Sequence, residues 1–160
     1  MADNTKERTE LILSIVRSKM KSSQAFMQYQ ETERRYDGHT ALYMREAHFI
    51  QAVDPESGSS MTQIAQQMNV TLGAVSQTAK RVESKGYIIR TKSKENHRQT
   101  IAFLTEKGKA FRAEHARYDR NLMEHYDQEF FHRFTDEQLQ MLLDYELGTL
   151  ALATKANSRN

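Results

Sequence analysis

The sequence of 160 residues predicts a mostly helical fold with one small β-hairpin, and three observations support this prediction. The chain has one proline and six glycines, so few residues would interrupt long helices. The stretch from Ser60 to Leu104 reads as two short helices, a tight turn between them and two β-rich segments. Amphipathic helical patterns occupy both ends of the chain. We therefore predict a winged helix-turn-helix flanked by terminal helices.

The N-terminal part of the sequence predicts a long helix over residues 6–36 and a second helix that ends at Val53. Thr40 is a suitable N-cap for the second helix, and Asp54–Gly58 has the composition of a turn. Apolar side chains recur in these two helices near helical spacing at Leu11, Ile15, Phe26, Tyr29, Leu42, Tyr43, Phe49 and Ile50.

The first short helix is predicted over Met61–Met68, with Ser60 as its N-cap. One face, which we expect to be buried, carries Ile64, Ala65 and Met68. Asn69 tolerates the left-handed conformation and is expected to end the helix. Val70 is expected to fill the turn as an apolar plug.

The second short helix is predicted from Leu72 to Lys85, with Thr71 as its N-cap and Gly86 after its end. Its predicted buried stripe follows helical spacing and consists of Leu72, Val75, Ala79 and Val82. The opposite face carries side chains that can donate to phosphates or read base edges, namely Ser76, Gln77, Lys80, Arg81 and Ser84.

The hairpin is predicted from two segments rich in β-branched and aromatic residues, Tyr87–Thr91 and Thr100–Leu104, which flank the polar loop Lys92–Gln99. From Lys80 to Arg98 the chain has seven cations and two anions, a local net charge of +5. The whole chain has a net charge of only +2. Positive charge is therefore concentrated on the predicted DNA-facing surface.

The C-terminal part predicts a long helix from Thr105 to about Phe131 and a last helix to about Leu150. Thr135 and Gln138 form a capping box at the start of the last helix. The terminal helices are amphipathic and cannot all cover their apolar faces on so small a core, so we expect a second copy of the chain to cover them. A two-fold dimer would place two DNA-reading helices about 34–36 Å apart and predicts a palindromic operator.

Three segments resemble the MarR family of bacterial transcription regulators, namely Asn69–Ser76, Lys85–Ile88 and the close of the basic wing at Leu104–Lys109. The resemblance covers about residues 40–112. It implies a homodimeric DNA-binding repressor whose affinity for DNA is set by a ligand. In this arrangement 1–36 is an N-terminal dimerisation helix, 37–104 a winged helix-turn-helix DNA-binding domain, and 105–160 the C-terminal dimerisation helices.

The candidate DNA contacts fall into three groups. We predict that bases are read by Thr71, Ser76 and Gln77, and that phosphates are held by Lys80, Arg81, Lys92 and Lys94. In the wing, the family usually has an acidic residue and two arginines where this sequence has Asn96, His97 and Arg98. The match implies that Arg98 enters the minor groove and that His97 is a weaker, pH-sensitive contact. The alternative, which Asn96 and His97 favour, is a non-catalytic interaction module that has lost DNA binding.

The sequence is compatible with three kinds of effector. The branch of the family that represses fatty-acid synthesis is similar at Val70–Gly73 and Arg45–His48, and implies a long acyl chain on acyl carrier protein that tightens DNA binding. Side chains able to line an apolar pocket are Met20, Phe26, Met27, Met44, Phe49, Phe111 and Met123. A small aromatic acid is an alternative effector.

Zinc is the third candidate effector. His115 and Asp119 lie four residues apart on a predicted helix, a spacing that lets both bind one ion. Similarity to metal-responsive relatives implies that His48 is a further ligand, and Glu31 could complete the site. The alternative is that these histidines are hydrogen-bonded residues of the core or of an interface.

Several classes of protein are excluded or disfavoured by the composition. The sequence has no cysteine, which excludes disulfides, zinc–thiolate sites and thiol redox sensing. It has no Gly-rich phosphate loop, nucleophile elbow or paired His–Glu zinc helix, so we expect neither an enzyme nor a required cofactor. No apolar run approaches the roughly 20 residues of a membrane span, and Met1–Asn4 lacks signal-peptide character. We therefore expect a cytoplasmic protein without a membrane partner.

Overall fold

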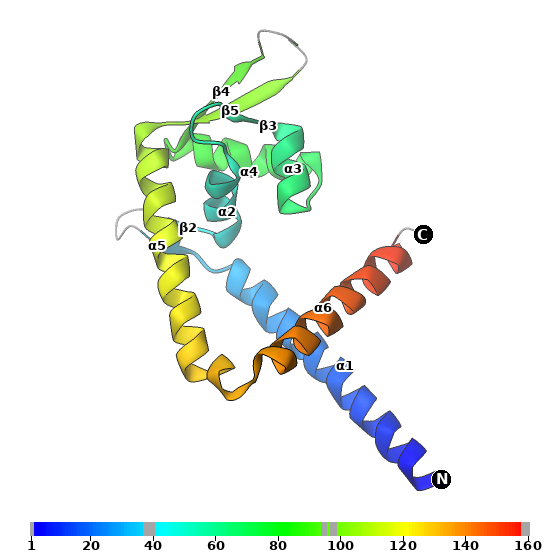
Figure 1. Ribbon diagram of the computed structural model, residues 1–160. Coiled ribbons are helices and arrows are strands. Elements are labelled where there is room, and N and C mark those ends of the chain that lie inside the picture. Colours follow the sequence, from blue (N-terminus) through cyan, green and yellow to red (C-terminus); the bar gives the residue numbers. More distant parts are fainter. Residues whose placement is uncertain (1, 37–40, 94–95, 97–98, 158–160) are drawn as a thin grey trace. The chain divides into compact units, whose positions relative to one another are not determined.

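The computed structural model describes residues 2–36, 41–93, 96 and 99–157 (Figure 1), with the side chains of 2–4 and 156–157 left out of the description. Helices make up most of this described part, as the sequence predicts. The chain divides into two compact units, Met1–Ala116 and Arg117–Asn160. No described helix combines the length and the apolar character needed to cross a membrane.

The first unit begins with helix α1 (Ala2–Gln30), which is shorter than the predicted helix over 6–36. The chain leaves the helix because Arg34–Arg35 forms strand β1, which pairs antiparallel with β2 (Ala41–Leu42). Arg34 also closes the helix end, since its Nη1 donates to the carbonyl of Tyr29 at 2.6 Å. Its guanidinium lies 3.5 Å from the centre of the Tyr29 ring. The prediction that one helix continues to residue 36 was therefore wrong.

Helix α2 (Met44–Ala52) begins later than predicted, because residues 41–42 are in β2 and the N-cap is Tyr43. Thr40, the predicted N-cap, lies outside the described residues. The Tyr43 amide donates to Glu46 Oε2 at 3.0 Å. After α2 comes the predicted turn, in which Asp54 Oδ1 accepts hydrogen bonds from the amide of Ser57 at 2.7 Å and its hydroxyl at 2.8 Å.

The two short helices are α3 (Met61–Met68) and α4 (Leu72–Ser84), and their predicted caps are confirmed. Ser60 Oγ accepts from the amide of Gln63 at 3.2 Å, and Gln63 Oε1 accepts from the amide of Ser60 at 2.8 Å. Asn69 adopts the left-handed conformation with φ 52° and ψ 47°. Thr71 Oγ1 accepts from the amide of Ala74 at 3.3 Å. These local bonds hold the tight turn between the two helices.

The predicted hairpin is formed by β4 (Ile88–Lys92) and β5 (Thr100–Leu104), and β5 also pairs with the short strand β3 (Ser59–Ser60). A strand of two residues has no hydrophobic pattern of its own, so the sequence did not predict β3. Gly58 precedes β3 with φ +70°, and a Cβ there would lie 2.6 Å from the carbonyl oxygen of Ala102. This glycine allows the backbone to approach the hairpin closely.

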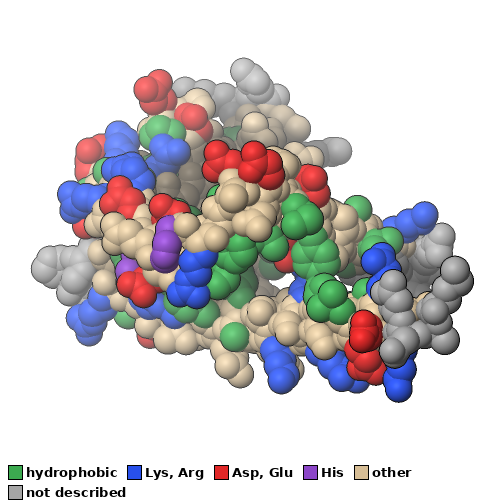
Figure 2. Space-filling model, turned by 60° about the horizontal axis from the view of Figure 1, so that its bottom comes forward, with side chains coloured by type: hydrophobic (Ala, Val, Ile, Leu, Met, Phe, Trp, Pro, Cys, Tyr) green, Lys and Arg blue, Asp and Glu red, His purple; other side chains and the backbone are tan. Residues whose placement is uncertain are grey.

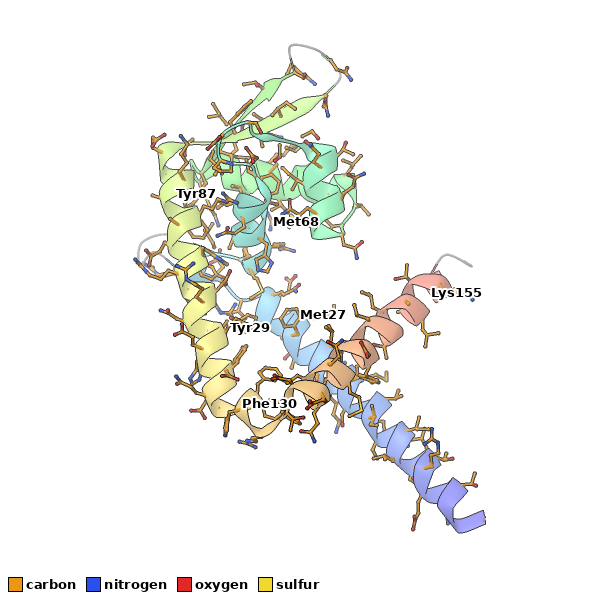
Figure 3. All side chains as sticks on the ribbon, in the orientation of Figure 1. Met27, Tyr29, Met68, Tyr87, Phe130 and Lys155 are labelled. Atoms are coloured by element: carbon orange, nitrogen blue, oxygen red, sulfur yellow. The ribbon has the colours of Figure 1, made fainter. Side chains whose placement is uncertain are left out.

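The core of the first unit lies between α2, α3, α4 and the sheet, and its fully buried large side chains include Leu42, Phe49, Ile50, Ile64, Val75, Val82, Tyr87 and Ile88. Helix α5 (Glu106–Glu129) starts against this core. Its Phe111 ring lies 5.3 Å from the ring of Tyr87, and Lys107 Nζ lies 4.2 Å from the centre of that ring. Tyr87 is labelled in Figure 3.

Three apolar residues predicted to be buried are not. Val70 is 43% exposed, so it does not fill the turn, and Leu72 is 52% exposed. Met68 is half-buried. The buried stripe of α4 consists of Val75, Thr78, Ala79 and Val82, and Leu72 lies one turn before it, at the first residue of the helix. Helical spacing predicts which face is buried, but not how far along the helix the neighbouring elements extend.

The second unit contains the rest of α5, a short 3₁₀ helix η1 (Phe131–Arg133) and α6 (Asp136–Asn157). Helix α5 ends two residues before the predicted end, and α6 continues beyond the predicted end at Leu150. The predicted capping box is confirmed, because Thr135 Oγ1 accepts from the amide of Gln138 at 3.3 Å and the Thr135 amide donates to Gln138 Oε1 at 2.9 Å.

Candidate nucleic-acid interface

The face of α4 opposite the core carries the predicted base-reading and phosphate-binding residues of the helix. Thr71, Gln77, Lys80 and Arg81 are exposed, and Ser76 is half-buried. The opposite face of the same helix is anchored by the fully buried side chains of Val75, Ala79 and Val82. Figure 1 shows the β4–β5 hairpin extending beyond the helices of this unit. The arrangement presents a hydrogen-bonding helix face and a projecting hairpin in one compact unit.

Among the described cations of this stretch, two are paired with acidic side chains of the same unit. Lys85 Nζ donates to Glu46 Oε2 at 2.7 Å and to the carbonyl of Ala41 at 2.9 Å. The Glu46 side chain is completely buried, and the Lys85 side chain is 25% exposed. The sequence count treated Lys85 as part of the positive surface, whereas the structure uses it to hold the end of α4 against α2 and β2.

The second paired cation is Arg90 on β4. Its Nε donates to Glu83 Oε2 at 3.0 Å, and its amide donates to Glu83 Oε1 at 3.2 Å. The side-chain hydrogen bond from Arg90 holds the pKa of Glu83 below its ordinary value of 4.5, opposed by partial burial. This pair ties the last turn of α4 to the first strand of the hairpin.

The remaining described cations of this stretch are Lys80, Arg81 and Lys92, and all three are exposed. Lys92 stands at the end of β4, where its Nζ approaches Thr100 Oγ1 at 3.4 Å. Beyond it the loop is closed by the Ser93 amide, which donates to the carbonyl of Gln99 at 2.9 Å. Lys94, His97 and Arg98 lie outside the described residues, so their predicted contacts stay predictions.

An exposed apolar patch at the start of α4 was missed by the sequence analysis. Val70 and Leu72 are both exposed, and they line a hollow between α3 and the start of α4 together with Thr62, Ala65, Gln66, Asn69 and Thr71. The only sequence signal was that an apolar residue occupies the first position of α4, where the helical pattern suggested burial.

The candidate zinc ligands are only partly brought together. The rings of His48 and His115 lie 5.9 Å apart, with His48 exposed and His115 2% exposed. Glu31 accepts a hydrogen bond from Arg45 Nη1 at 3.3 Å. Asp119 belongs to the second unit. Among the described residues, no group of three or more His, Asp or Glu side chains is placed to hold a metal ion. The zinc site stays a prediction.

The side chains predicted to line a ligand pocket have different environments. Met44, Phe49 and Phe111 are buried in the core of the first unit. The others are exposed, with Met20, Phe26 and Met27 on α1 and Met123 on α5. Figure 3 labels Met27. The effector pocket therefore stays a prediction.

The terminal helices expose many large apolar side chains. On α1 these are Leu11, Ile12, Leu13, Ile15, Val16, Met20, Phe26 and Met27, and on α6 they are Met141, Leu142, Leu143, Leu147, Leu150 and Leu152. Figure 2 shows hydrophobic side chains reaching the surface among charged ones. Apolar helix faces of this extent are typical of a surface that another protein covers.

Residues 42–100 match the model of the MarR family. A curated relative, an uncharacterised HTH-type transcriptional regulator YhjH of Bacillus subtilis (strain 168), is 29% identical over 98 residues. The aligned segment covers 61% of this chain and 55% of that protein, so the chain matches about half the length of this relative.

Three solved structures share the fold. FabT of Streptococcus pneumoniae, solved in complex with DNA, is 20% identical with a TM-score of 0.60, over 92% of this chain and 97% of that chain. The zinc-responsive MarR family member ZitR of Lactococcus lactis is 23% identical with a TM-score of 0.62, over 87% and 99%. The transcriptional regulator SlyA is 19% identical with a TM-score of 0.66, over 89% and 95%.

The matched segment 42–100 contains α2, the helix-turn-helix of α3 and α4, and β4. It is the segment in which the caps of α3 and α4 and the left-handed Asn69 were predicted from the residues and found in the structure. The chain is therefore similar to the MarR family over residues 42–100, and it shares its fold with solved members over most of its length.

Proposed function

We propose that this protein is a sequence-specific regulator of transcription that binds double-stranded DNA and acts as a repressor. The observation that carries the proposal is the exposed face of α4, where Gln77, Lys80 and Arg81 stand opposite a buried stripe, beside a hairpin that bears Lys92. A helix of this kind can enter the major groove while the wing follows the adjacent backbone. FabT, which has the same fold, was solved bound to DNA, and this supports the proposal.

The residue roles follow from chemistry and exposure. Thr71, Ser76 and Gln77 offer neutral donors and acceptors that suit base edges. Lys80, Arg81 and Lys92 offer positive charge that suits phosphates. We keep Lys94, His97 and Arg98 as wing contacts on the strength of the sequence. Neutral amides and hydroxyls would then give specificity, and the cations would give most of the affinity.

The proposed active form is a homodimer. The exposed apolar faces of α1 and α6 need a covering surface, and a second copy of the same chain supplies one of matching chemistry. A two-fold pair of α4 helices would read two half-sites of a palindromic operator about 34–36 Å apart. Because its ligand is chromosomal DNA, the protein would act in the cytoplasm.

The test is a binding titration on a duplex selected by the protein from a random library. If the dimer neutralises about 6–10 phosphates, the affinity should fall by about 10³–10⁵-fold between about 50 and 200 mM salt. Fluorescence anisotropy over this range measures the slope directly. Failure to bind any duplex at low salt would instead support an interaction module that has lost DNA binding.

Control of DNA binding by an effector is the second part of the proposal, and an acyl chain, an aromatic acid and zinc are the candidates. Mass spectrometry of molecules that co-purify with the protein would identify an organic effector. It would distinguish an acyl chain, carried by a partner such as acyl carrier protein, from a small aromatic acid.

A zinc-responsive regulator is favoured by one observation, the adjacent rings of His48 and His115. Two histidines are fewer ligands than the three or four that zinc sites in proteins generally have. Adding zinc to the wild type and to a His48→Ala variant during the DNA titration tests this candidate. A zinc effect on the affinity of the wild type that the variant lacks would support it, and no effect on either would rule it out.

A further inference from the structure

The first turn of α4 exposes an apolar side chain where the fold does not require one. Leu72 is 52% exposed, although the core of the unit is built from other residues of the same helix. Outside α1, the large apolar side chains that are exposed in the described part of the first unit are Val70, Leu72 and Ile89. Leu72 is the one that stands on α4 itself.

The next residue, Gly73, also has no explanation within the chain. Gly86 has φ +79° and Gly58 has φ +70°, so both need the backbone freedom of glycine. Gly73 lies inside α4 with ordinary helical backbone, and a Cβ there would meet only Thr71 Oγ1, at 3.9 Å. A glycine within a helix lowers stability relative to alanine. Its open position leaves room for something outside the chain to approach the backbone closely.

The partner that approaches Gly73 must suit the rest of the same helix face. Gln77 and Lys80 follow Gly73 by four and seven residues, so the three positions are aligned on one face. Both side chains are exposed, and Arg81 adds a second cation beside them. This face has the charge and donors that complement DNA. In the major groove, the apolar group that base edges offer is the C5-methyl of thymine.

We propose that Leu72 reads a thymine methyl group in each half-site, and that the missing side chain of Gly73 lets the first turn of α4 come close enough to do so. This inference rests on the proposed DNA-binding function and adds a specificity residue to it. Leu72 supplies the apolar contact, Gly73 supplies the space, and Gln77 and Lys80 hold the helix in the groove.

The test replaces each thymine of the selected duplex by deoxyuridine, which removes the methyl group and keeps every hydrogen-bonding group. At one position in each half-site, the wild-type protein should lose about fourfold in affinity, the value of burying one methyl-sized group. Leu72→Ala should bind the thymine duplex more weakly and show no further loss with deoxyuridine at that position. The matched control is Ile89→Ala, an exposed apolar truncation on β4, which should keep the full deoxyuridine penalty.

A second variant, Gly73→Ala, tests whether the absence of a side chain at this position is needed for DNA binding. It should melt at a temperature equal to or above that of the wild type, and it should bind the selected duplex about fivefold more weakly or worse, because the added methyl group overlaps the DNA.

Three results would overturn the inference while DNA binding by the wild type stands. They are the absence of any thymine position sensitive to deoxyuridine, an unchanged penalty in Leu72→Ala, or a lower oligomeric mass of Leu72→Ala in light scattering, which would make Leu72 a contact between copies. A wild type that selects no duplex would instead refute the proposed function itself.

Discussion

At the scale of single residues, the contact between Lys85 and the buried Glu46 shows that a cation of the positive stretch has a structural role. Glu46 is fully buried, and its Oε2 accepts from Lys85 Nζ at 2.7 Å and from the Tyr43 amide at 3.0 Å. The contact joins the end of α4 to the start of α2. A residue that the sequence count assigned to the positive surface is thus a positioning residue for the helix.

We expect Lys85→Ala to lower the free energy of unfolding by about 3–5 kcal/mol, because it leaves a buried carboxylate without its partner. The slope of DNA affinity against salt should stay unchanged. Urea unfolding measures the first quantity and the salt titration measures the second. Lys80→Ala is the matched control, since removing an exposed phosphate contact should reduce the slope by about 0.9 per site and leave stability unchanged. A reduced slope with unchanged stability in Lys85→Ala would contradict this assignment.

The hydrogen bond between Arg90 and Glu83 predicts a pH effect on stability. Because that bond lowers the pKa of Glu83 in the folded protein, the stabilisation is present above the ordinary value of 4.5. It is lost as the pH falls through the lower folded-state pKa. On acidification below about pH 5, the wild type should therefore lose more stability than Glu83→Gln, as measured by urea unfolding at several pH values. An identical loss in both proteins would show that the pair does not contribute.

At the scale of elements, different contacts fix the position of α4 and that of the hairpin. Local caps at Ser60, Asn69 and Thr71 fix the helix-turn-helix, and the buried residues Val75 and Val82 fix which face of α4 points outward. The hairpin is held to α4 by Glu83 and Arg90. The exposed residues of α4 can therefore change without loss of the fold.

Replacing Gln77 by alanine should change which operator sequence is preferred, by about 1–3 kcal/mol for each lost base contact. Gln77 is exposed, so the melting temperature should not move. Repeating the selection from a random duplex library with the variant measures the preference. Equal weakening on all sequences would identify Gln77 as a phosphate contact instead.

Replacing Arg98 by alanine should weaken operator binding without unfolding the protein, because the resemblance matches Arg98 to the arginine by which the family enters the minor groove. A gel-shift titration measures the affinity, and circular dichroism checks the fold. An affinity equal to that of the wild type would remove Arg98 from the interface.

At the scale of the whole molecule, the exposed apolar faces of the terminal helices predict the assembly. Leu147 and Leu150 lie one turn apart on α6 and are both exposed. We expect the double change Leu147→Glu and Leu150→Glu to give a monomer in light scattering, because charges on a covered apolar face must stay hydrated. The affinity for DNA should fall when dimerisation is lost. Gly148→Glu is the control and should remain a dimer, because it adds a charge at an exposed position of α6 that does not share a face with either leucine. A monomeric wild type would contradict the prediction.

The sequence by itself determined the helix-turn-helix and the hairpin, because their signals are local. A cap acts within three residues, Asn69 needs only its own backbone preference, and the β-branched and aromatic content of β4 and β5 is visible in a few residues. The same local reasoning identified the outward face of α4 and the exposed positions of Gln77, Lys80 and Arg81.

Only the tertiary structure decided the features that depend on segments far apart in the chain. Lys85 is bound by Glu46, thirty-nine residues away, so no local pattern could remove it from the positive surface. Helix α1 ends early because the residues after it pair as β1 with β2. Leu72 is exposed because no neighbouring element of the described chain covers the first residue of α4. Caps and turns are encoded by neighbours in the sequence, whereas burial and charge pairing depend on which distant surfaces meet, and this is the physical reason for the division.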